Sequence, residues 1–545
     1  MDKVMSVIEE WRARIEPHAL HQWIAAEDDG VELEQKLWFS LYFMNFIMYF
    51  RELNIYHVGY RGQSGANVYC DAITRHADED LTHSRLFMRD FKTLGWDKSL
   101  GWRPSEVFHW LFTHPATEGL RRRTVKIAKL YIESQDPFVR FAVVESIEAC
   151  GNALFRHTTK LADRYKLKTG KDLVYFGAFH LARETGHAVD SEDEGLFHGL
   201  QLSDEQRERA TARAVRAFEL IEEQNTDMLQ LAQKTIHNGG FRDQRRGPMI
   251  VELLPDPPMG QLSEAQATAW PNAYEFNFWP NKPHVSQQPL VQRLLEALHE
   301  VRSVQLGQLF DTHDPAQMLA SLRLGLMYFA TDCTGTPTFY QNMVTYSDPQ
   351  TLHERAINRI ASRFGLRSKL LYVDWQSLSL DEKLGWPVSR TLEFIYLDRA
   401  TETHRDLRAV ITHHIDVTDD PLLRYWTIVT LKTVTNAHSD VIARLARRAE
   451  RQFGISLPYM ASRQCAALEI EADPELDGVE FDSLPVDAAT VRAVEGIIAG
   501  IARAAVLRGE KMLESVRNVD YPEVLSKSAP ALLEGARSSA ASLYA

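Results

Sequence analysis

Residues 136–165 form the stretch DPFVRFAVVESIEACGNALFRHTTKLADRY. Its apolar side chains recur every three or four residues, which is the period of an amphipathic α-helix, and residues 203–235 have the same pattern. Runs of alternating β-branched residues, the usual signature of strands, are few in the whole chain. The sequence therefore predicts an all-α protein.

The same stretch belongs to an internal repeat with an offset of 284 residues. So long a register without a gap is not expected by chance, and we predict two copies of one helical unit, residues 1–238 and 286–545, joined by a connector at 239–285. The connector is rich in proline, glycine, glutamine and asparagine. The matched pairs are Asp97/Asp381, Leu100/Leu384, Gly101/Gly385, Trp102/Trp386, Asp136/Asp420, Pro137/Pro421, Arg140/Arg424, Asn152/Asn436, Leu161/Leu445, Ala162/Ala446 and Arg164/Arg448.

Composition excludes several classes of protein. The 545 residues carry a formal net charge of -13, so the chain has no electrostatic reason to bind nucleic acid or an acidic membrane surface. The longest apolar run, Leu37–Phe50, is shorter than the roughly 20 residues of a membrane-spanning helix. The four cysteines lie far apart, and the first residues lack a secretory signal. We expect a cytoplasmic protein with reduced thiols and a small-molecule partner.

Three segments carry residues that could bind metal. In HLARETGH, His180, Glu184 and His187 have the spacing i, i+4, i+7 and project from one face of a helix. In HADEDLTH, Asp80 and His83 form an acid-x-x-His pair. Two such helices and a carboxylate from a third make the inner surface of a bundle that binds two metals, and this donor set suits iron, manganese or zinc.

The third helix carries Glu145 and Glu148. Glu145 interrupts an apolar surface, where a carboxylate needs a partner or a metal, whereas Glu148 could be a ligand or an exposed residue. The predicted metal ligands are Asp80, His83, Glu145, His180, Glu184 and His187, with His76 and Glu148 as further candidates.

The second copy lacks these ligands. At the offset of 284, Asp80 corresponds to Phe364, His83 to Arg367, Glu145 to Val429, Glu148 to Lys432 and His180 to Gln464. We therefore predict that residues 286–545 form a degenerate pseudo-domain without metal.

In these motifs the chain resembles the haem-oxygenase-like diiron oxidases and oxygenases, over about residues 30–235. Two features depart from that family: Asp80 is shorter than the usual glutamate, and His76 stands where some members place the first carboxylate. The resemblance implies a haem-oxygenase-like helical bundle with two Fe2+ in its reduced form. It also implies O2 as co-substrate, a peroxo-diiron(III) intermediate and an external electron donor where the reaction needs one.

The same resemblance implies either N-oxygenation of a small amine or amino acid, which we favour, or cleavage of a C–C bond in an amino or fatty acid. No catalytic residue beyond the metal ligands is predicted. Several arginines near the ligand motifs could bind a substrate carboxylate. These are Arg75, Arg85, Arg89, Arg140 and Arg183.

Two other interpretations stay open. A ferritin-like carboxylate bundle would add Glu52 as a ligand but leaves His180 without a role. A metal-free helical binding or scaffold protein is the alternative that is not an enzyme. Iron analysis distinguishes it from the haem-oxygenase-like and ferritin-like interpretations, which both require metal. Motifs for nucleotide-phosphate binding and the Gly-x-Ser-x-Gly elbow are absent. We also expect the two copies to pack as an internal pseudo-dimer through Leu37–Phe50 and Leu319–Phe329.

Overall fold

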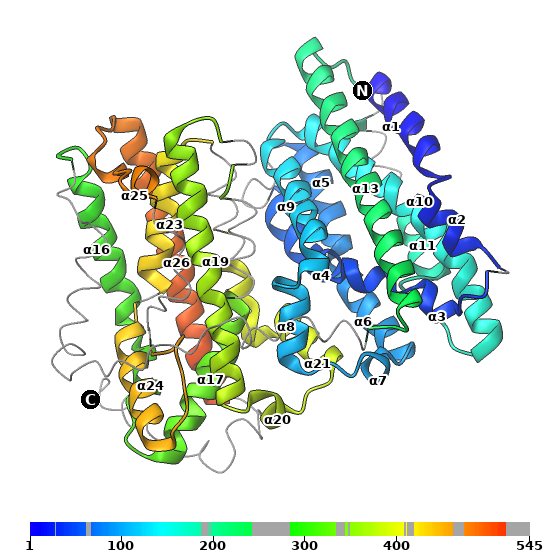
Figure 1. Cartoon of the computed structure of the whole chain (residues 1–545). Helices are drawn as coiled ribbons and strands as arrows, with labels where there is room; N and C mark the ends of the chain where they lie inside the picture. The colour runs from blue at the N-terminus through cyan, green and yellow to red at the C-terminus, as the bar shows by residue number, and fades with distance from the viewer. Residues whose placement is uncertain are drawn as a thin grey trace. The chain divides into compact units, whose positions relative to one another are not determined.

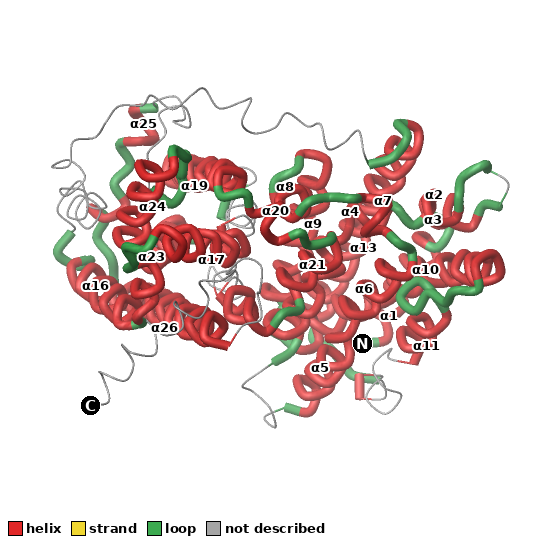
Figure 2. Tube along the Cα trace, turned by 90° about the horizontal axis from the view of Figure 1, so that it is seen from below, coloured by secondary structure: helices red, strands yellow, loops and turns green. Residues whose placement is uncertain are grey.

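A computed structural model of the chain is shown in Figure 1. The structure describes residues 1–27, 29–60, 67–186, 196–197, 199–241, 284–333, 344–346, 349–407, 410, 419–435, 437–461 and 473–518. Every regular element within these ranges is helical, as the colouring of Figure 2 also shows. The predicted all-α class is therefore confirmed.

The chain divides into two compact units. Unit 1 comprises Met1–Arg246 together with Trp386–Leu397, and unit 2 comprises Gly247–Gly385 and Asp398–Ala545. Most of the predicted connector, residues 242–283, lies outside the described residues.

Unit 1 holds most of the residues singled out by their chemistry. Its described elements are α1 (Asp2–Ile15), α2 (Ala19–Ala25), α3 (Leu33–Lys36), α4 (Phe39–Leu53), the π-helical η1 (Asn54–Val58), α5 (Val68–Glu79), the 3-10 turn η2 (Asp80–Thr82), α6 (His83–Thr93), α7 (Trp96–Leu100), α8 (Pro104–Phe112), the 3-10 turn η3 (Pro115–Thr117), α9 (Glu118–Glu133), α10 (Pro137–Thr169), α11 (Ala178–Gly186), α13 (Asp204–His237) and α21 (Val388–Tyr396).

The centre of unit 1 is the pair of long helices α10 and α13, which pack along each other and against α1, α2 and α4 (Figure 1). Asp136 caps the start of α10 by accepting the Phe138 N–H, and proline occupies the first turn. Ser203 starts α13 with a capping box. Helix α4 is apolar and buried along almost its whole length. Side chains of α4, α10 and α13 thus form the core next to the candidate site.

Helix α21 lies far along the chain yet belongs to unit 1 by its contacts. It packs against α4, α6, α7 and α8. The backbone N–H and the hydroxyl of Ser389 both donate to the carboxylate of Asp97, at 2.7 Å each, and the Tyr396 hydroxyl donates to Asn45 at 2.7 Å. Sequence analysis placed this helix in the second domain, because its contacts with unit 1 leave no local pattern in the sequence.

Unit 2 is built from fewer described helices. They are α16 (Gln288–Ser303), the 3-10 turn η5 (Gln305–Phe310), α17 (Pro315–Cys333), α19 (Leu352–Ser377), α20 (Leu380–Leu384), the 3-10 turn η6 (Arg399–Thr401), α23 (Pro421–Thr435), α24 (Ser439–Phe453), α25 (Pro474–Asp477), the 3-10 turn η8 (Phe481–Ser483) and α26 (Ala488–Asn518). Helices α16, α23 and α26 pack together, and α17 packs against α19 and α24.

Element boundaries in the two units recur at the 284-residue offset. Helices α7 and α20, and the 3-10 turns η3 and η6, correspond at both ends, and α23 and α26 start at the positions that match the starts of α10 and α13. Helix α19 starts where α5 does and runs through the positions of η2 and α6.

Buried hydrogen bonds recur at the same offset. The carboxylate of Asp90 in unit 1 accepts the backbone N–H groups of Tyr175 and Phe176. In unit 2 the carboxylate of Asp374 accepts those of Tyr459 and Met460. Arg121 and Arg405 each donate to a threonine hydroxyl on the preceding turn and to the carbonyl three residues before it. Each unit therefore closes the same loops with the same side chains.

None of the described helices combines the length and the apolar character that crossing a membrane requires.

Candidate metal centre

The first three candidate ligands lie on a nearly continuous helix made of α5, η2 and α6. The 3-10 turn at Asp80–Thr82 interrupts the α-helical pattern between His76 and His83, and Asn67 caps the start of α5 by accepting the Tyr69 N–H. The fourth, Glu148, lies on α10, which packs against α5. The α5–η2–α6 segment and α10 thus bring the side chains of His76, Asp80 and Glu148 into one interior region.

His76, Asp80 and Glu148 form the centre of the site. They are 4%, 4% and 7% exposed, and their ligand atoms all lie within 4.8 Å of one another. The Nε2 atom of His76 is 3.4 Å from Asp80 Oδ2 and 3.5 Å from Glu148 Oε1. Among the described residues no second group of three such side chains comes this close. The interpretation of Glu148 as an exposed residue is therefore wrong.

The cluster carries an excess of negative charge. Burial lowers the pKa of His76, but the carboxylates of Asp80, Glu148 and Glu145 outweigh it and raise the pKa to about 10. Two or three carboxylates in a buried space need a positive charge beside them. Either a proton on His76 or a metal cation can supply that charge.

Two further histidines, His83 and His180, adjoin the cluster, and a backbone carbonyl orients the ring of each. The Nδ1 atom of His83 lies 2.8 Å from the Asp80 carbonyl, and that of His180 lies 2.8 Å from the Tyr175 carbonyl. Because a carbonyl oxygen can only accept, both Nδ1 atoms carry a proton, and in the neutral ring the lone pair is then on Nε2. Metal-binding histidines are commonly oriented in this way. The two rings pack edge to face, with centroids 4.5 Å apart.

Helix α11 reaches this region through an arginine. Arg183 donates to the Thr82 hydroxyl at 3.1 Å and to the Glu79 carbonyl at 3.1 Å, which ties α11 to the end of α5 and to η2. The side chain of Glu184 and the whole of His187 lie outside the described residues. Glu145 is half-buried on α10 and acts on His76 through its charge.

Two residues that sequence analysis did not single out adjoin the cluster. Burial and the carboxylates of Glu148 and Asp80 raise the pKa of Tyr131 far above its ordinary value, so this tyrosine is a neutral phenol. Burial and Glu148 likewise raise the pKa of the Cys150 thiol. Tyr131 belongs to α9 and follows an apolar helical pattern, so its sequence context indicates only a core residue.

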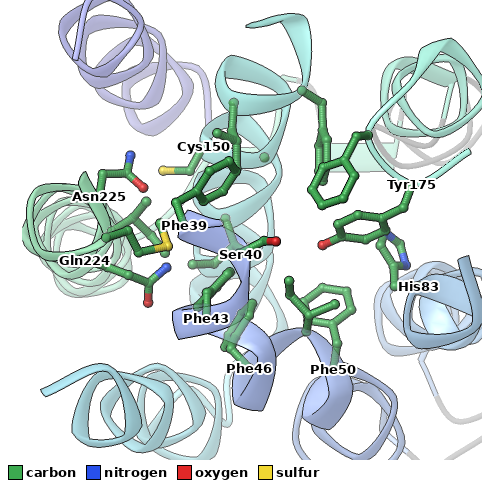
Figure 3. Close-up of a pocket in the computed structure, with 18 of the residues that line it drawn as sticks. Phe39, Ser40, Phe43, Phe46, Phe50, His83, Cys150, Tyr175, Gln224 and Asn225 are labelled. Atoms are coloured by element: carbon green, nitrogen blue, oxygen red, sulfur yellow. The ribbon is translucent and has the colours of Figure 1, made fainter. Parts of the chain in front are cut away.

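An apolar cavity of about 80 Å³ opens beside the cluster. Glu148 and His83 form part of its wall, and α4 contributes six residues, four of them phenylalanines (Figure 3). The full lining is Phe39, Ser40, Phe43, Phe46, Ile47, Phe50, His83, Ile147, Glu148, Cys150, Gly151, Leu154, Phe155, Tyr175, Phe176, Ile221, Gln224, Asn225 and Met228. Most of these residues were not predicted, because they come from helices distant in sequence.

None of the arginines considered for binding a substrate carboxylate lines this cavity. Arg75, Arg85 and Arg89 are exposed. Arg140 is buried, and its guanidinium donates to the carbonyls of Ser134, Val58 and Tyr131. Its role is therefore structural.

The positions of unit 2 that correspond to the cluster are described in part. Val429, opposite Glu145, is buried, and Lys432, opposite Glu148, is half-buried. The side chains of Phe364 and Arg367 and the whole of Gln464 lie outside the described residues. Glu52, the extra ligand of a ferritin-like site, is buried with Arg51 2.9 Å from its Oε1.

No protein-family model matches the chain, and comparison with curated proteins found no match.

Proposed function

We propose that unit 1 holds a non-haem diiron centre and that the chain is an O2-dependent oxygenase. The observation that carries this proposal is the buried set His76, Asp80 and Glu148, extended by His83 and His180, which opens onto an apolar cavity. Carboxylates and imidazoles are a donor set that suits iron.

The residues of the chain have separable tasks in such a centre. Two bound Fe2+ ions would supply the electrons that activate O2 for attack on the substrate. Asp80 and Glu148 would balance the charge of the ions, and the carbonyls of Asp80 and Tyr175 hold the two imidazoles in the ligating tautomer. The phenol of Tyr131 keeps its proton beside the carboxylates. The aromatic side chains of α4 exclude water from the cavity.

Within this class we favour N-oxygenation, with C–C bond cleavage as the alternative. Both reactions need a substrate that sits against the metals in a space without bulk water, and the cavity wall formed by His83 and Glu148 provides that position.

We further propose that the two units are copies of one ancestral haem-oxygenase-like bundle. The shared element boundaries and the equivalent hydrogen bonds of Asp90 and Asp374 support this view. The changes from Glu145 to Val429 and from Glu148 to Lys432 support a second copy without metal.

The test begins with the full chain, reconstituted with Fe2+ in the absence of O2 and then exposed to O2. We expect about two irons per chain and O2 consumption. His83→Ala and His180→Ala should lose both while keeping the helical circular dichroism signal. His237→Ala, at an exposed histidine of α13, is the control and should behave as wild type. Full iron content and O2 consumption in both ligand variants would refute the proposal.

A metal-free function has one observation in its favour. The raised pKa of His76 fits a protonated imidazole bridging two carboxylates as a buried ion-pair network. In that case purified protein would contain no iron, and added Fe2+ would leave its thermal midpoint unchanged. If iron instead raises the midpoint, the metal centre is the better description.

A further inference from the structure

The cavity beside the cluster is polar at two opposite sides and mainly apolar between them, where the Ser40 hydroxyl already donates to the Leu37 carbonyl. His83 and Tyr175 lie on one side, and Gln224 and Asn225 of α13 lie on the other (Figure 3). The phenylalanine side chains of α4, among them Phe43 and Phe46, form the wall between the two sides. A molecule that reaches from one side to the other must therefore have an apolar body.

Gln224 has no hydrogen-bond partner among the described residues for its buried Oε1 atom, although the side chain is only 1% exposed. Leaving a buried amide oxygen without a donor destabilises a folded protein. The neighbouring Asn225 differs, since its amide nitrogen donates to His21 Nε2 at 3.4 Å. A ligand group that donates a hydrogen bond to Gln224 would remove this cost.

The charges of the lining limit the ligand further. No lysine or arginine is among the lining residues, and the one carboxylate, Glu148, belongs to the cluster. A carboxylate or ammonium group placed beside Gln224 would lose its hydration without gaining a counter-ion. The group that pairs with Gln224 must be uncharged.

The size of the cavity sets an upper limit. A volume of about 80 Å³ corresponds to room for roughly six water-sized groups. This space suits a short branched chain. A cavity of about 150 Å³ is what holds benzene, so a substituted ring enters only with small shifts of the lining side chains, and a long fatty chain is too large.

We infer that the substrate is a small uncharged molecule with an apolar body and one hydroxyl or amide group that pairs with Gln224. Its opposite end then faces His83 and Glu148. This inference rests on the proposed function in taking the ligand to be the substrate. It differs from the small amine or amino acid expected from the sequence, because an amino acid carries a carboxylate and an ammonium group and an aliphatic amine is an ammonium ion near neutral pH. N-oxygenation of such a substrate then needs an uncharged nitrogen, such as that of an aromatic amine. A hydroxyl both donates and accepts, so it can pair with either orientation of the Gln224 amide.

Binding of four matched probes to the metal-free full chain tests the inference by equilibrium dialysis. The probes are benzyl alcohol, toluene, benzoate and benzylammonium. Wild-type protein should bind benzyl alcohol best and the two ions at least roughly tenfold more weakly. In Gln224→Leu, the preference for benzyl alcohol over toluene should fall by roughly three- to tenfold. Gln230→Leu, the same substitution at an exposed position of α13, should leave the preference unchanged.

Several outcomes would overturn the inference. They are tighter binding of benzoate or benzylammonium, an unchanged preference in Gln224→Leu with a native circular dichroism signal, and failure of all four probes to bind. Because the protein is metal-free in this assay, its result is independent of iron content. A chain that binds two irons and consumes O2 but binds none of the probes keeps the proposed function and loses this inference.

Discussion

Replacing Arg140 with methionine should destabilise unit 1 and disrupt the candidate metal centre. The guanidinium donates to the Ser134 carbonyl at 2.9 Å, the Val58 carbonyl at 3.1 Å and the Tyr131 carbonyl at 3.1 Å. It also stacks on Tyr60, with its central carbon 4.0 Å from the ring centroid. These bonds connect η1, the end of α9 and the start of α10. Element η1 packs against α5 and η2, which carry His76 and Asp80, and α10 carries Glu148.

The expected loss of unfolding free energy follows from the backbone carbonyls that Arg140 no longer pairs with. Methionine fills much of the same volume but leaves the Ser134 and Val58 carbonyls without this donor, at roughly 1–3 kcal/mol each. The Tyr131 carbonyl keeps the Ser134 N–H at 3.1 Å and loses about 1 kcal/mol. Relief from burying a guanidinium offsets part of this loss, and burial does lower the pKa of Arg140. We expect unit 1 to lose about 4 kcal/mol of its free energy of unfolding.

Unit 2 contains a matched control for this variant. Arg424 donates to the Val344 carbonyl at 2.9 Å and to Asp419 at 2.9 Å, and stacks on Tyr346 at 4.0 Å. The Asp419 side chain is 81% exposed, so that ion pair contributes little. Arg424→Met should therefore cost unit 2 about 2 kcal/mol and leave iron binding intact.

Hydrogen exchange read by mass spectrometry separates the two units. Arg140→Met should lose protection in peptides covering residues 54–60 and 128–140, and should bind less than the wild-type amount of iron. Arg424→Met should lose protection only in peptides of unit 2. Wild-type protection of residues 54–60 in Arg140→Met would refute the assignment of this arginine as the connection between η1, α9 and α10.

Three further results are expected. Burial lowers the pKa of His21 from 6.5 to about 4, so the folded state binds fewer protons than the unfolded state between these values. The free energy of unfolding, measured in urea, should fall by about 3 kcal/mol as pH drops from 6.5 to 4, and His21→Gln should remove this component. Ser379 has a φ of 52°, and Gly95, at the corresponding position of unit 1, has 69°. Ser379→Gly should therefore raise the free energy of unfolding, and Gly95→Ala should lower it, by roughly 0.5–1 kcal/mol each. The thermal midpoint should shift in the same directions, and opposite shifts would contradict the strain argument. Glu148→Gln should weaken iron binding at least roughly tenfold in a metal titration, and more than Glu145→Gln does, whereas the reverse order would make Glu145 the ligand.

The helices that frame the site could be predicted from sequence, because their start signals are local. Asp136 followed by Pro137 gives α10 its cap and its first turn, and Ser203 starts α13 with a capping box. Both helices begin within a residue or two of the positions that the patterns indicated. The membership of α21 in unit 1 could not be predicted, since only contacts with residues hundreds of positions away determine it.

The choice between Glu145 and Glu148 illustrates a different limit. Residues 141–150 of α10 are almost all buried, so the apolar pattern there does not distinguish one helix face from another. Only the packing of α10 against α5 places Glu148 beside His76 and Asp80. The sequence supplied both carboxylates as candidates, and the helix-to-helix geometry decided which one joins the cluster.

Gln224 was missed although the sequence contains a signal for it. Glu222 and Glu223 precede it and suggest a solvated face, yet Ile221 three residues earlier and Met228 four residues later are apolar. That spacing places Gln224 on the buried stripe of α13, where a polar residue needs a partner. A polar residue at an apolar position of a helix is therefore the signal that the sequence carries for this site.

If the units are copies, as we propose, buried polar residues can be sorted by what became of them at the 284-residue offset. Arg140 and Asp90 have counterparts that make equivalent contacts in unit 2, so their role is to hold the fold. Glu148 corresponds to a lysine, and Gln224 corresponds to Arg508, which is also buried. A fold that forms in both units does not require a glutamine at this position. On this proposal, Gln224 belongs with Glu148 among the residues that serve the chemistry proposed for unit 1.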